Sequence, residues 1–325
     1  MDMAYCLKPV MRLYIPVIDI HLCNLRLSMH SPLRLGIDLG GTKIEIIGLK
    51  GGRQCLRRRV ATPQGDYQET LAVIAELIEA TERELNETGS VGIGIPGNRS
   101  PDHGLIKNAN STCLIGKDLQ GDLETLLQRP VRLANDADCL AWSEATDGAG
   151  AGAASVFAVI LGTGVGGGLV IHGRLLGGPN AIAGEWGHNP LPWRRAEDGP
   201  VQRCYCGQDD CIETFLSGPG WAARSALGLD APALVAAAKT NNGAAQRALE
   251  IYCDQLARGL ASVINLIDPK VIVLGGGLSN IPALYTQVPQ LLARYVFSDQ
   301  VNTRLVPAQH GDSSGVRGAA WLWNE

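Results

Sequence analysis

A strand, a glycine turn and a second strand occur twice in this chain of 325 residues, and this repeat constrains the fold more than any other feature. The first copy covers residues 33–49, where LRLGIDL is followed by GGT and then by the alternating run KIEIIGL. The second covers residues 155–175, as SVFAVIL, GTGVGGG and LVIHGRL. VGIGIPG at 91–97 and VIVLGGG at 271–277 form a further pair of strands that run into glycine loops. This duplication predicts two related lobes whose glycine loops face each other.

Amphipathic segments with apolar spacing near 3.6 residues lie between these strands and predict helices over residues 67–85 and 248–267. Pro269 ends the second helix, because proline cannot continue it and restricts Asp268 before it. Helices and strands therefore alternate, which predicts an α/β fold that includes antiparallel hairpins. With 46% hydrophobic and 18% charged residues, the composition excludes a disordered or collagen-like chain.

The charge balance argues against nucleic acid or a membrane surface as partner. A formal net charge of −4 gives no global positive field, and the arginines at 57–59 are interpreted as a solvated strand edge. No apolar run reaches the 18 or so residues of a membrane span. Nine cysteines, an odd and mostly scattered set, indicate no disulfide framework, so we expect a reducing, cytoplasmic location.

Residues 1–32 precede the first regular pattern and lack the apolar core and cleavage site of a secretory signal. We interpret them as a disordered extension or as the product of a mis-called start, with Met29 as the functional initiator.

Two glycine loops carry the residue types that bind phosphates. A carboxylate, glycine N–H groups, a hydroxyl and an ammonium group suit a nucleoside triphosphate with Mg²⁺, and they occur together in Asp38, Gly40, Gly41, Thr42 and Lys43. The second loop contains Gly162, Thr163 and Gly164. Its G-x-G-x-x-G match continues into a strand instead of a helix, which argues against a dinucleotide site, and no P-loop motif is present. For the first loop, a tight hairpin turn with polar residues is the alternative.

Asp136 follows the strand-like run VRLAN and precedes a helical stretch. A carboxylate at such a junction can accept a proton from a substrate hydroxyl. The alternative is that Asn135 or Asp136 only caps the helix.

A metal-type cluster occurs within 24 residues as His188, Cys204, Cys206 and Cys211. Three thiolates and an imidazole match tetrahedral structural zinc. The spacing C-x-C-x₄-C is not the common C-x-x-C, so unpaired core cysteines remain the alternative.

Taken together, seven motifs resemble those of the ROK family of sugar kinases and repressors, from about Arg34 to the C-terminus. They are GIDLGGTK (36–43), GIGIPG (92–97), NDAD (135–138), ILGTGVGGG (160–168), GEWGH (184–188), CYCGQDDCIE (204–213) and VLGGG (273–277). The resemblance implies a two-lobed, actin-like and hexokinase-like (ribonuclease H-like) fold with a duplicated core and a deep interlobe cleft. It implies one lobe from residues 34–140 plus 311–325 and another from 141–310, with a zinc-binding insertion at 188–211.

Within the family, KNANST (107–112), GEWGHNPLPW (184–193) and HGDSSGVRGAAWLW (310–323) are most similar to bacterial fructokinases of the manno(fructo)kinase type. The resemblance implies ATP-dependent phosphorylation of the 6-hydroxyl of D-fructose, with mannose as a further substrate. N-acetylglucosamine kinase or glucokinase activity is the alternative. A sugar-responsive repressor is the alternative of another class, disfavoured because only about 33 residues precede the first strand.

The resemblance also implies a role for each matching residue. Asp136 becomes the general base, and the sugar contacts become Asn110, Asn135, Glu185, His188 and Glu213. The nucleotide and Mg²⁺ are assigned to the two glycine loops, and the adenosine end to Gly275, Gly276 and Gly277. Zinc holds His188 through one ring nitrogen while the other faces the sugar. A homodimer is expected from family habit.

Two residues depart from the family pattern. Asp138 stands where asparagine is usual, which adds charge beside Asp136. Asp210 replaces the usual glycine before Cys211, in the turn of the metal cluster.

Overall fold

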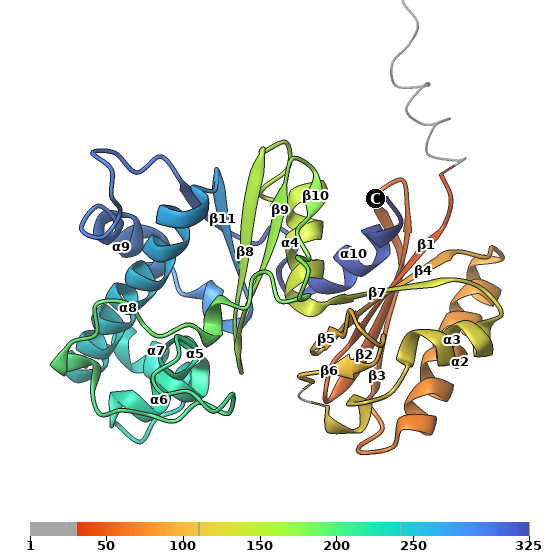
Figure 1. Ribbon diagram of the computed structural model, residues 1–325, viewed down its shortest axis with the longest axis horizontal. Helices are drawn as coiled ribbons and strands as arrows, with labels where there is room; N and C mark the ends of the chain where they lie inside the picture. Colours follow the sequence, from red (N-terminus) through yellow and green to blue (C-terminus); the bar gives the residue numbers. More distant parts are fainter. Residues whose placement is uncertain (1–30, 110, 241, 325) are drawn as a thin grey trace, which may run out of the picture.

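The computed structural model describes residues 31–109, 111–240 and 242–324, and the expectation for residues 1–32 lies almost entirely outside them. Two five-stranded sheets with the same plan dominate the chain (Figure 1). The first has the order β3-β2-β1-β4-β7 and the second β10-β9-β8-β11-β12. In each, the central strand pairs antiparallel with its hairpin partner and parallel with the strand that follows a long helix. The predicted duplication is therefore confirmed.

The strands of the first sheet are β1 (Arg34–Leu39), β2 (Lys43–Lys50), β3 (Arg53–Ala61), β4 (Ser90–Ile95) and β7 (Val131–Asn135). Those of the second are β8 (Ser155–Leu161), β9 (Val165–Ile171), β10 (Arg174–Leu175), β11 (Val271–Gly275) and β12 (Arg304–Pro307). A separate short ladder joins β5 (Asn98–Arg99) and β6 (Ile106–Lys107).

The α-helices are α2 (Tyr67–Leu85), α3 (Leu119–Leu127), α4 (Asp136–Thr146), α5 (Glu213–Leu216), α6 (Gly218–Ser225), α7 (Ala231–Lys239), α8 (Gly243–Ile267), α9 (Ala283–Leu292) and α10 (Ser314–Trp321). Short 3₁₀ turns are η1 (Thr112–Leu114), η2 (Trp186–His188), η3 (Ala196–Asp198), η4 (Gly277–Asn280), η5 (Gly311–Ser313) and η6 (Leu322–Asn324).

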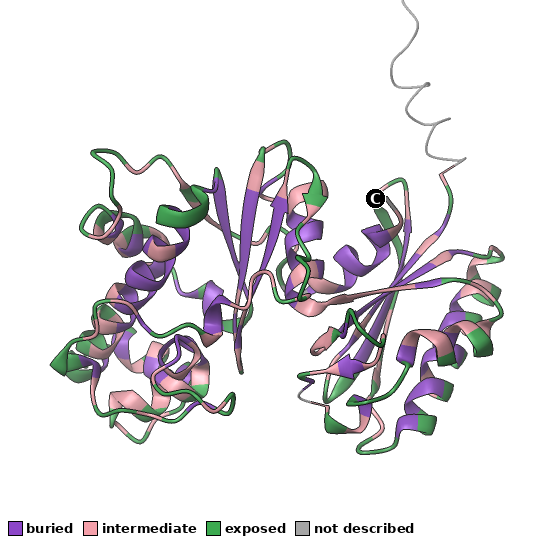
Figure 2. Cartoon of the chain, viewed as in Figure 1, coloured by how far each residue is buried: buried purple, intermediate pink, exposed green. Residues whose placement is uncertain are grey.

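The helices form layers on both sides of the sheets. Alternate residues of β2 face opposite cores, because side chains in a strand alternate between faces: Ile46 packs with α2, whereas Ile47 packs with α4 and α10. In the second sheet Phe157 packs with α8, and Val156 faces the same α4 and α10 cluster as Ile47. Helices α4 and α10 thus lie between the two sheets, and Figure 2 shows their facing sides as buried.

Two long helices begin and end at residues that satisfy free backbone groups. Asp66 accepts the N–H of Glu69 at 3.0 Å at the start of α2, at the predicted boundary. Helix α8 begins at Gly243, five residues before the predicted start, and Asn242 accepts the N–H of Ala245. The prediction was wrong there because residues 243–247 (GAAQR) carry no large apolar side chain to mark the helical period. As predicted, α8 ends at Ile267, and the residue that caps it, Asp268, has a left-handed φ of 48°.

Glycines permit α10 to approach its neighbours more closely than a β-carbon would allow. A Cβ at Gly318 would lie 1.7 Å from the carbonyl oxygen of Cys139 in α4. A Cβ at Gly36 in β1 would lie 2.1 Å from a carbonyl oxygen of α10, and one at Gly92 in β4 would lie 1.9 Å from another. Real Cβ atoms cannot occupy such positions, so these three glycines are required by packing.

The chain therefore returns to the first sheet through α10. The expected division of the lobes, which adds residues 311–325 to the first lobe, assumes such a return. The expected boundary after residue 140 falls inside α4, which contacts both α10 and the second sheet. The division itself stays a prediction. Among the helices that the structure describes, none is long and apolar enough to cross a membrane.

We predict that Gly318→Ala lowers the free energy of unfolding by about 3 kcal/mol, because the helix must move away from α4. Gly315→Ala in the same helix is the matched control, since nothing lies within 4 Å of its added Cβ. That variant is expected to be neutral or more stable by about 0.5–1 kcal/mol, since alanine favours helix. Chemical denaturation measures both, and equal stabilities of the two variants would contradict the packing argument.

Candidate functional site

Asp38 and Asp136 lie at the same edge of the first sheet. Asp38 is near the end of β1, and Asp136 directly follows β7. Both strands run parallel to β4, so their carboxyl ends meet at one edge, where α/β sheets place their ligands. The fold therefore places Asp38 and Asp136 at the same edge of the sheet, with β4 between the two strands that carry them.

The environment of both carboxylates disfavours their charged forms. Burial raises the pKa of Asp136 to about 6, and the charges of Asp38 and Glu185 add to the rise. Burial likewise raises the pKa of Asp38 to about 6, with Glu45 adding to the shift and Lys43 opposing it. Because each charged form is disfavoured, both groups titrate close to neutral pH.

The start of α4 holds Asp136 in place. The side chain of Asn135 accepts the N–H of Ala137 at 2.8 Å, and its amide donates to the carbonyl of Gly97 at 3.0 Å. Asp136 Oδ1 accepts the same N–H at 2.7 Å. The capping alternative is thus correct for Asn135. Capping alone does not account for burying the Asp136 carboxylate beside two other acids.

Glu185 joins this cluster from the segment before η2. The amide of Asn98 donates to Glu185 Oε1 at 2.7 Å, which links β5 to a residue 87 positions away. Asn98 was not predicted as a site residue. Its only signal in the sequence is its place directly after the GIGIPG loop.

The first glycine loop forms the predicted turn between β1 and β2. The N–H of Gly40 donates to the carbonyl of Lys43 at 3.0 Å, and the Thr62 hydroxyl donates to the carbonyl of Gly40 at 2.7 Å. Gly41, Thr42 and Lys43 are exposed on this turn. Their side chains and backbone can therefore meet a ligand.

Glu213, a predicted sugar-binding residue, stabilises the second glycine loop. The N–H of Gly162 donates to the carbonyl of Gly164 at 3.0 Å, which closes the turn around Thr163. Glu213 Oε2 accepts the N–H of Val165 at 2.9 Å. A Cβ at Gly164 would lie 2.9 Å from that same oxygen. One carboxylate oxygen of Glu213 thus stabilises the hairpin.

Atoms of the protein itself pack closely against two of the three glycines in the third loop. A Cβ at Gly276, where φ is 81°, would lie 2.4 Å from the carbonyl oxygen of Leu161. One at Gly275 would lie 2.8 Å from the Leu140 side chain, whereas Gly277 faces open space. Of the three glycines assigned to adenosine, Gly275 is buried, and Gly276 and Gly277 are exposed to solvent.

The His/Cys cluster has the geometry of a four-donor site. Cys204 Sγ is 3.6 Å from His188 Nδ1, Cys206 Sγ is 3.6 Å from Cys211 Sγ, and all four donor atoms lie within 4.8 Å of one another. Metal–sulfur bonds of about 2.3 Å at tetrahedral angles give donor separations of about 3.8 Å. These residues could therefore hold a tetrahedral metal ion.

The two departures from the family pattern differ in what surrounds them. Asp210 has a left-handed φ of 53°, the conformation for which glycine is usual. Its carboxylate accepts from Arg194 at 2.8 Å, from Arg224 at 3.0 Å and from the N–H of Gln202 at 3.0 Å. These hydrogen bonds stabilise the turn before Cys211 with aspartate at the position where glycine is usual. Asp138 lies two residues further into the helix that Asp136 begins. Burial raises the pKa of the neighbouring Cys139, and the charge of Asp138 adds to the rise.

Tyr205, between two of the cysteines, was also not predicted as a site residue. Burial raises its pKa to about 12, and the charges of Glu213 and Glu185 add to the rise. The residue as a whole is 70% exposed, and its hydroxyl lies 3.0 Å from His188 Nε2. Of the predicted sugar contacts, Asn110 falls outside the described residues.

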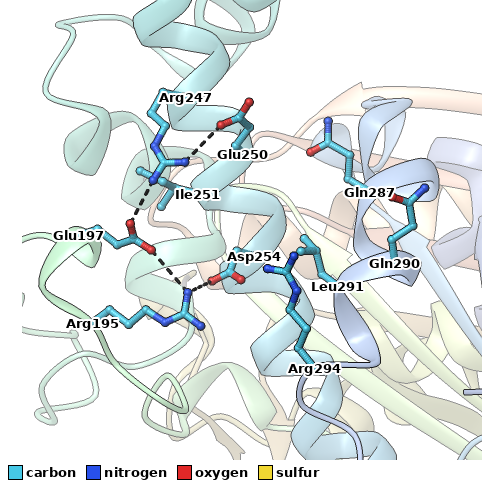
Figure 3. Close-up of a pocket in the computed structure, with 10 residues that line it drawn as sticks. All are labelled: Arg195, Glu197, Arg247, Glu250, Ile251, Asp254, Gln287, Gln290, Leu291 and Arg294. Atoms are coloured by element: carbon cyan, nitrogen blue, oxygen red, sulfur yellow. Dashed lines mark hydrogen bonds and ion pairs between the residues drawn. The ribbon is translucent and has the colours of Figure 1, made fainter. Parts of the chain in front are cut away.

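A surface cavity of about 350 Å³ beside α8 and α9 contains none of the predicted site residues (Figure 3). Its arginines pair within the cavity: Arg247 contacts Glu197 and Glu250, and Arg195 contacts Asp254. With three arginines and three carboxylates in its lining, the cavity carries no net charge to select an ion.

Comparison with known proteins agrees with this geometry. The model of the family described as "ROK family" matches residues 34–325. The N-acetyl-D-glucosamine kinase of Escherichia coli O127:H6 is 41% identical over 296 residues, which cover 88% of this chain and 98% of that protein.

Two solved structures share the fold. The ROK hexokinase from Thermus thermophilus has a TM-score of 0.78 at 31% identity, covering 89% of this chain and 96% of that one. A ROK family glucokinase from Streptomyces griseus, in complex with glucose and AMPPNP, has a TM-score of 0.74 at 26% identity, covering 89% of this chain and 98% of that one. The expected two-lobed hexokinase-like architecture is thereby confirmed.

We predict that Asp136→Asn raises Tm at pH 8 by about 2–4 °C, because it removes a half-buried charge from beside two others. The sign follows from the raised pKa: the folded protein binds this proton more tightly, so stability is lost as pH rises from about 4 to about 6. The gain should therefore shrink as pH falls from about 6 to about 4. Asp102→Asn, at an exposed position, is the control and should leave Tm unchanged. An Asp136→Asn protein that is no more stable at pH 8 would refute the charge cluster.

Proposed function

The chain belongs to the ROK family, and on that premise we propose that it is a sugar kinase that transfers the γ-phosphoryl group of ATP to a hexose hydroxyl. The observation that carries the proposal is the half-buried Asp136 carboxylate at the start of α4, whose pKa is raised by burial and by the charges of Asp38 and Glu185. A kinase at 41% identity over nearly its whole length supports it.

N-acetyl-D-glucosamine is the sugar that we propose first, with its 6-hydroxyl as the acceptor. The support is the substrate named for the relatives at 41–42% identity. Glucose comes next, because the Streptomyces griseus structure contains it. The predictions of fructose and mannose find no support among the relatives named above.

Asp136 acts as the general base for the attacking hydroxyl. A base works best when its pKa is near the working pH, and burial with two neighbouring acids brings this carboxylate to about 6. Asn135 holds the helix start rigid, so the carboxylate does not need to be reoriented during the reaction. A positioned base contributes roughly 10²–10⁴-fold to the rate.

The remaining residues position ATP and sugar. The turns around Gly41 and Gly164 offer backbone N–H groups to phosphates, and Asp38 is an oxygen ligand for Mg²⁺ or its waters. Bound Mg²⁺ would neutralise charge on the transferring phosphoryl group. Glu185 and the free oxygen of Glu213 accept hydrogen bonds from sugar hydroxyls. Gly277 borders the adenosine end, where open space adjoins it.

The His/Cys cluster is proposed to hold structural zinc. Its donor set and spacing fit that ion, and the bound loop carries His188 and precedes Glu213. Zinc therefore positions binding residues and takes no part in phosphoryl transfer. A homodimer and a cytoplasmic location stay predictions.

A coupled assay of ADP release across N-acetylglucosamine, glucose, mannose and fructose tests the activity and the choice of sugar together. We expect the highest kcat/KM with N-acetylglucosamine. A preference for fructose would reverse the sugar assignment while keeping the kinase, and no sugar-dependent ADP release would reject the proposed activity.

Asp136→Asn should lower kcat by about 10²–10⁴-fold while the protein stays folded, because the hydroxyl loses its proton acceptor. Asp138→Asn makes the same chemical change two residues away, and it should retain kcat within about threefold. Steady-state kinetics at pH 8 measures both. Equal losses in the two variants, or a nearly wild-type Asp136→Asn, would remove Asp136 from this role.

Cys206→Ser should lose bound zinc and lower Tm by about 5 °C or more, because one of four ligands is removed. Cys55→Ser is the matched control, since Cys55 is exposed and lies outside the cluster. Metal analysis and thermal unfolding check both variants. Wild-type protein purified without any metal, yet fully active, would contradict the zinc site.

A further inference from the structure

The short ladder of β5 and β6 contacts one segment beyond the second sheet's hairpins at two points. The Asn98 amide in β5 donates to Glu185 Oε1 at 2.7 Å, and Lys107 Nζ in β6 donates to the carbonyl of Asn180 at 3.0 Å. Asn98 and Lys107 are themselves partners in the ladder. The contact between Asn98 and Glu185 therefore belongs to a two-point junction between distant parts of the chain.

The second sheet fixes the backbone of Glu185 through both of its neighbours. A Cβ at Gly184, where φ is 89°, would lie 2.1 Å from the carbonyl oxygen of Gly167 in β9. The ring nitrogen of Trp186 donates to another carbonyl of β9 at 3.1 Å. The second sheet thus sets where Glu185 stands, and Asn98 sets how its carboxylate is turned.

Asn98 is also connected to the proposed base. The carbonyl of Gly97, directly before it, accepts the side-chain amide of Asn135 at 3.0 Å. Asn135 in turn directly precedes Asp136 at the start of α4. One pair of adjacent residues therefore contacts both the helix start that holds the proposed base and the acid Glu185.

The Asn98 amide uses only one of the two carboxylate oxygens of Glu185. Among the residues that the structure describes, none donates a hydrogen bond to the other oxygen, Oε2. A carboxylate that is held through one oxygen keeps a fixed orientation, and its second oxygen can still accept from a ligand hydroxyl. Because the amide is uncharged, Glu185 also keeps its full negative charge, which makes it a strong acceptor.

Resting on the proposed sugar kinase activity, we infer that Asn98 is a positioning residue for sugar binding in this chain. It holds Oε1 of Glu185, so that Oε2 faces a sugar hydroxyl. Since β5 follows the first sheet's β4 and Glu185 lies beyond the second sheet's β10, the same bond aligns the two sides of the site around the sugar.

A double-mutant cycle at pH 8 tests this role. Asn98→Asp puts a second carboxylate against Glu185 and should raise the sugar KM and Kd by about thirtyfold, with kcat changed less than about threefold and the KM for ATP unchanged. Glu185→Gln removes the acid and should weaken sugar binding by about tenfold. In the double variant the amide and the carboxylate exchange sides, so the hydrogen bond returns while the amide oxygen faces the sugar.

The double variant should therefore bind sugar at least tenfold more tightly than the product of the two single effects predicts. Its net charge equals that of the wild type. Asn98→Ala removes the donor without adding charge, and it should raise the sugar KM by about fivefold.

Asn242→Asp is the matched control. It makes the same chemical change at the exposed cap of α8, where aspartate caps as well as asparagine, so the sugar KM should stay unchanged. Combined with Glu185→Gln, it should give additive effects. Additive effects of Asn98→Asp and Glu185→Gln would overturn the inference. So would an unchanged sugar KM in Asn98→Ala, or an equal rise in the KM for ATP, since each indicates a purely structural role.

Calorimetric binding of N-acetylglucosamine, glucose, mannose and fructose separates this inference from the proposed function. If the wild type phosphorylates a sugar but the cycle is additive, only the Asn98 assignment fails. If the wild type binds a sugar without phosphorylating it, the kinase proposal fails, and the cycle in Kd still decides the role of Asn98. Wild-type protein that binds none of the four sugars would overturn both.

Discussion

The carbonyl of Cys139 lies where a β-carbon of residue 318 would stand, and this contact between α4 and α10 fixes the geometry of the site. Helix α4 begins at Asp136, and α10 packs through Gly36 onto β1, which carries Asp38. The relative positions of these two carboxylates therefore depend on how closely two helices approach. The same helix α4 meets the second sheet at Gly168, where a Cβ would lie 2.5 Å from the Ala137 carbonyl. Packing in this middle layer thus connects the proposed base to both glycine loops.

This rigid layer holds together charges that repel one another. Burial raises the pKa of both Asp38 and Asp136 to about 6, and the charge of Glu45 adds to the rise at Asp38 while that of Asp38 adds to it at Asp136. The folded chain therefore keeps these acids ionised at neutral pH at a cost in stability. Functional sites commonly carry such a cost, which the rest of the fold must offset. Bound cations and substrate hydroxyls would relieve part of the repulsion, so the apo protein is the least favourable state for these acids. The positive end of α4 offsets part of this cost, because Asp136 is its first residue.

Local patterns predicted most of the fold, because strands and tight turns leave a signature within a few residues. The hairpins of both sheets and the start of α2 follow from such patterns, and the His/Cys cluster follows from residue types alone. Contacts between distant segments leave no such signature. The pairing of Asn98 with Glu185 and the ion pairs of Asp210 depend on loops that meet only in the folded chain. The same limit applies to the contact of Gly276 with Leu161, which the sequence does not indicate.

The central claim is that Asp136 and the glycine turns align one particular sugar hydroxyl with the γ-phosphate of ATP. Its most direct test is the position of phosphate on the product, read by phosphorus–proton correlation NMR after incubation with ATP, Mg²⁺ and N-acetylglucosamine. The account predicts a single 6-phosphate formed in equal amount with ADP. Phosphate on the anomeric oxygen, a mixture of positional isomers, or ADP released with inorganic phosphate alone would contradict it.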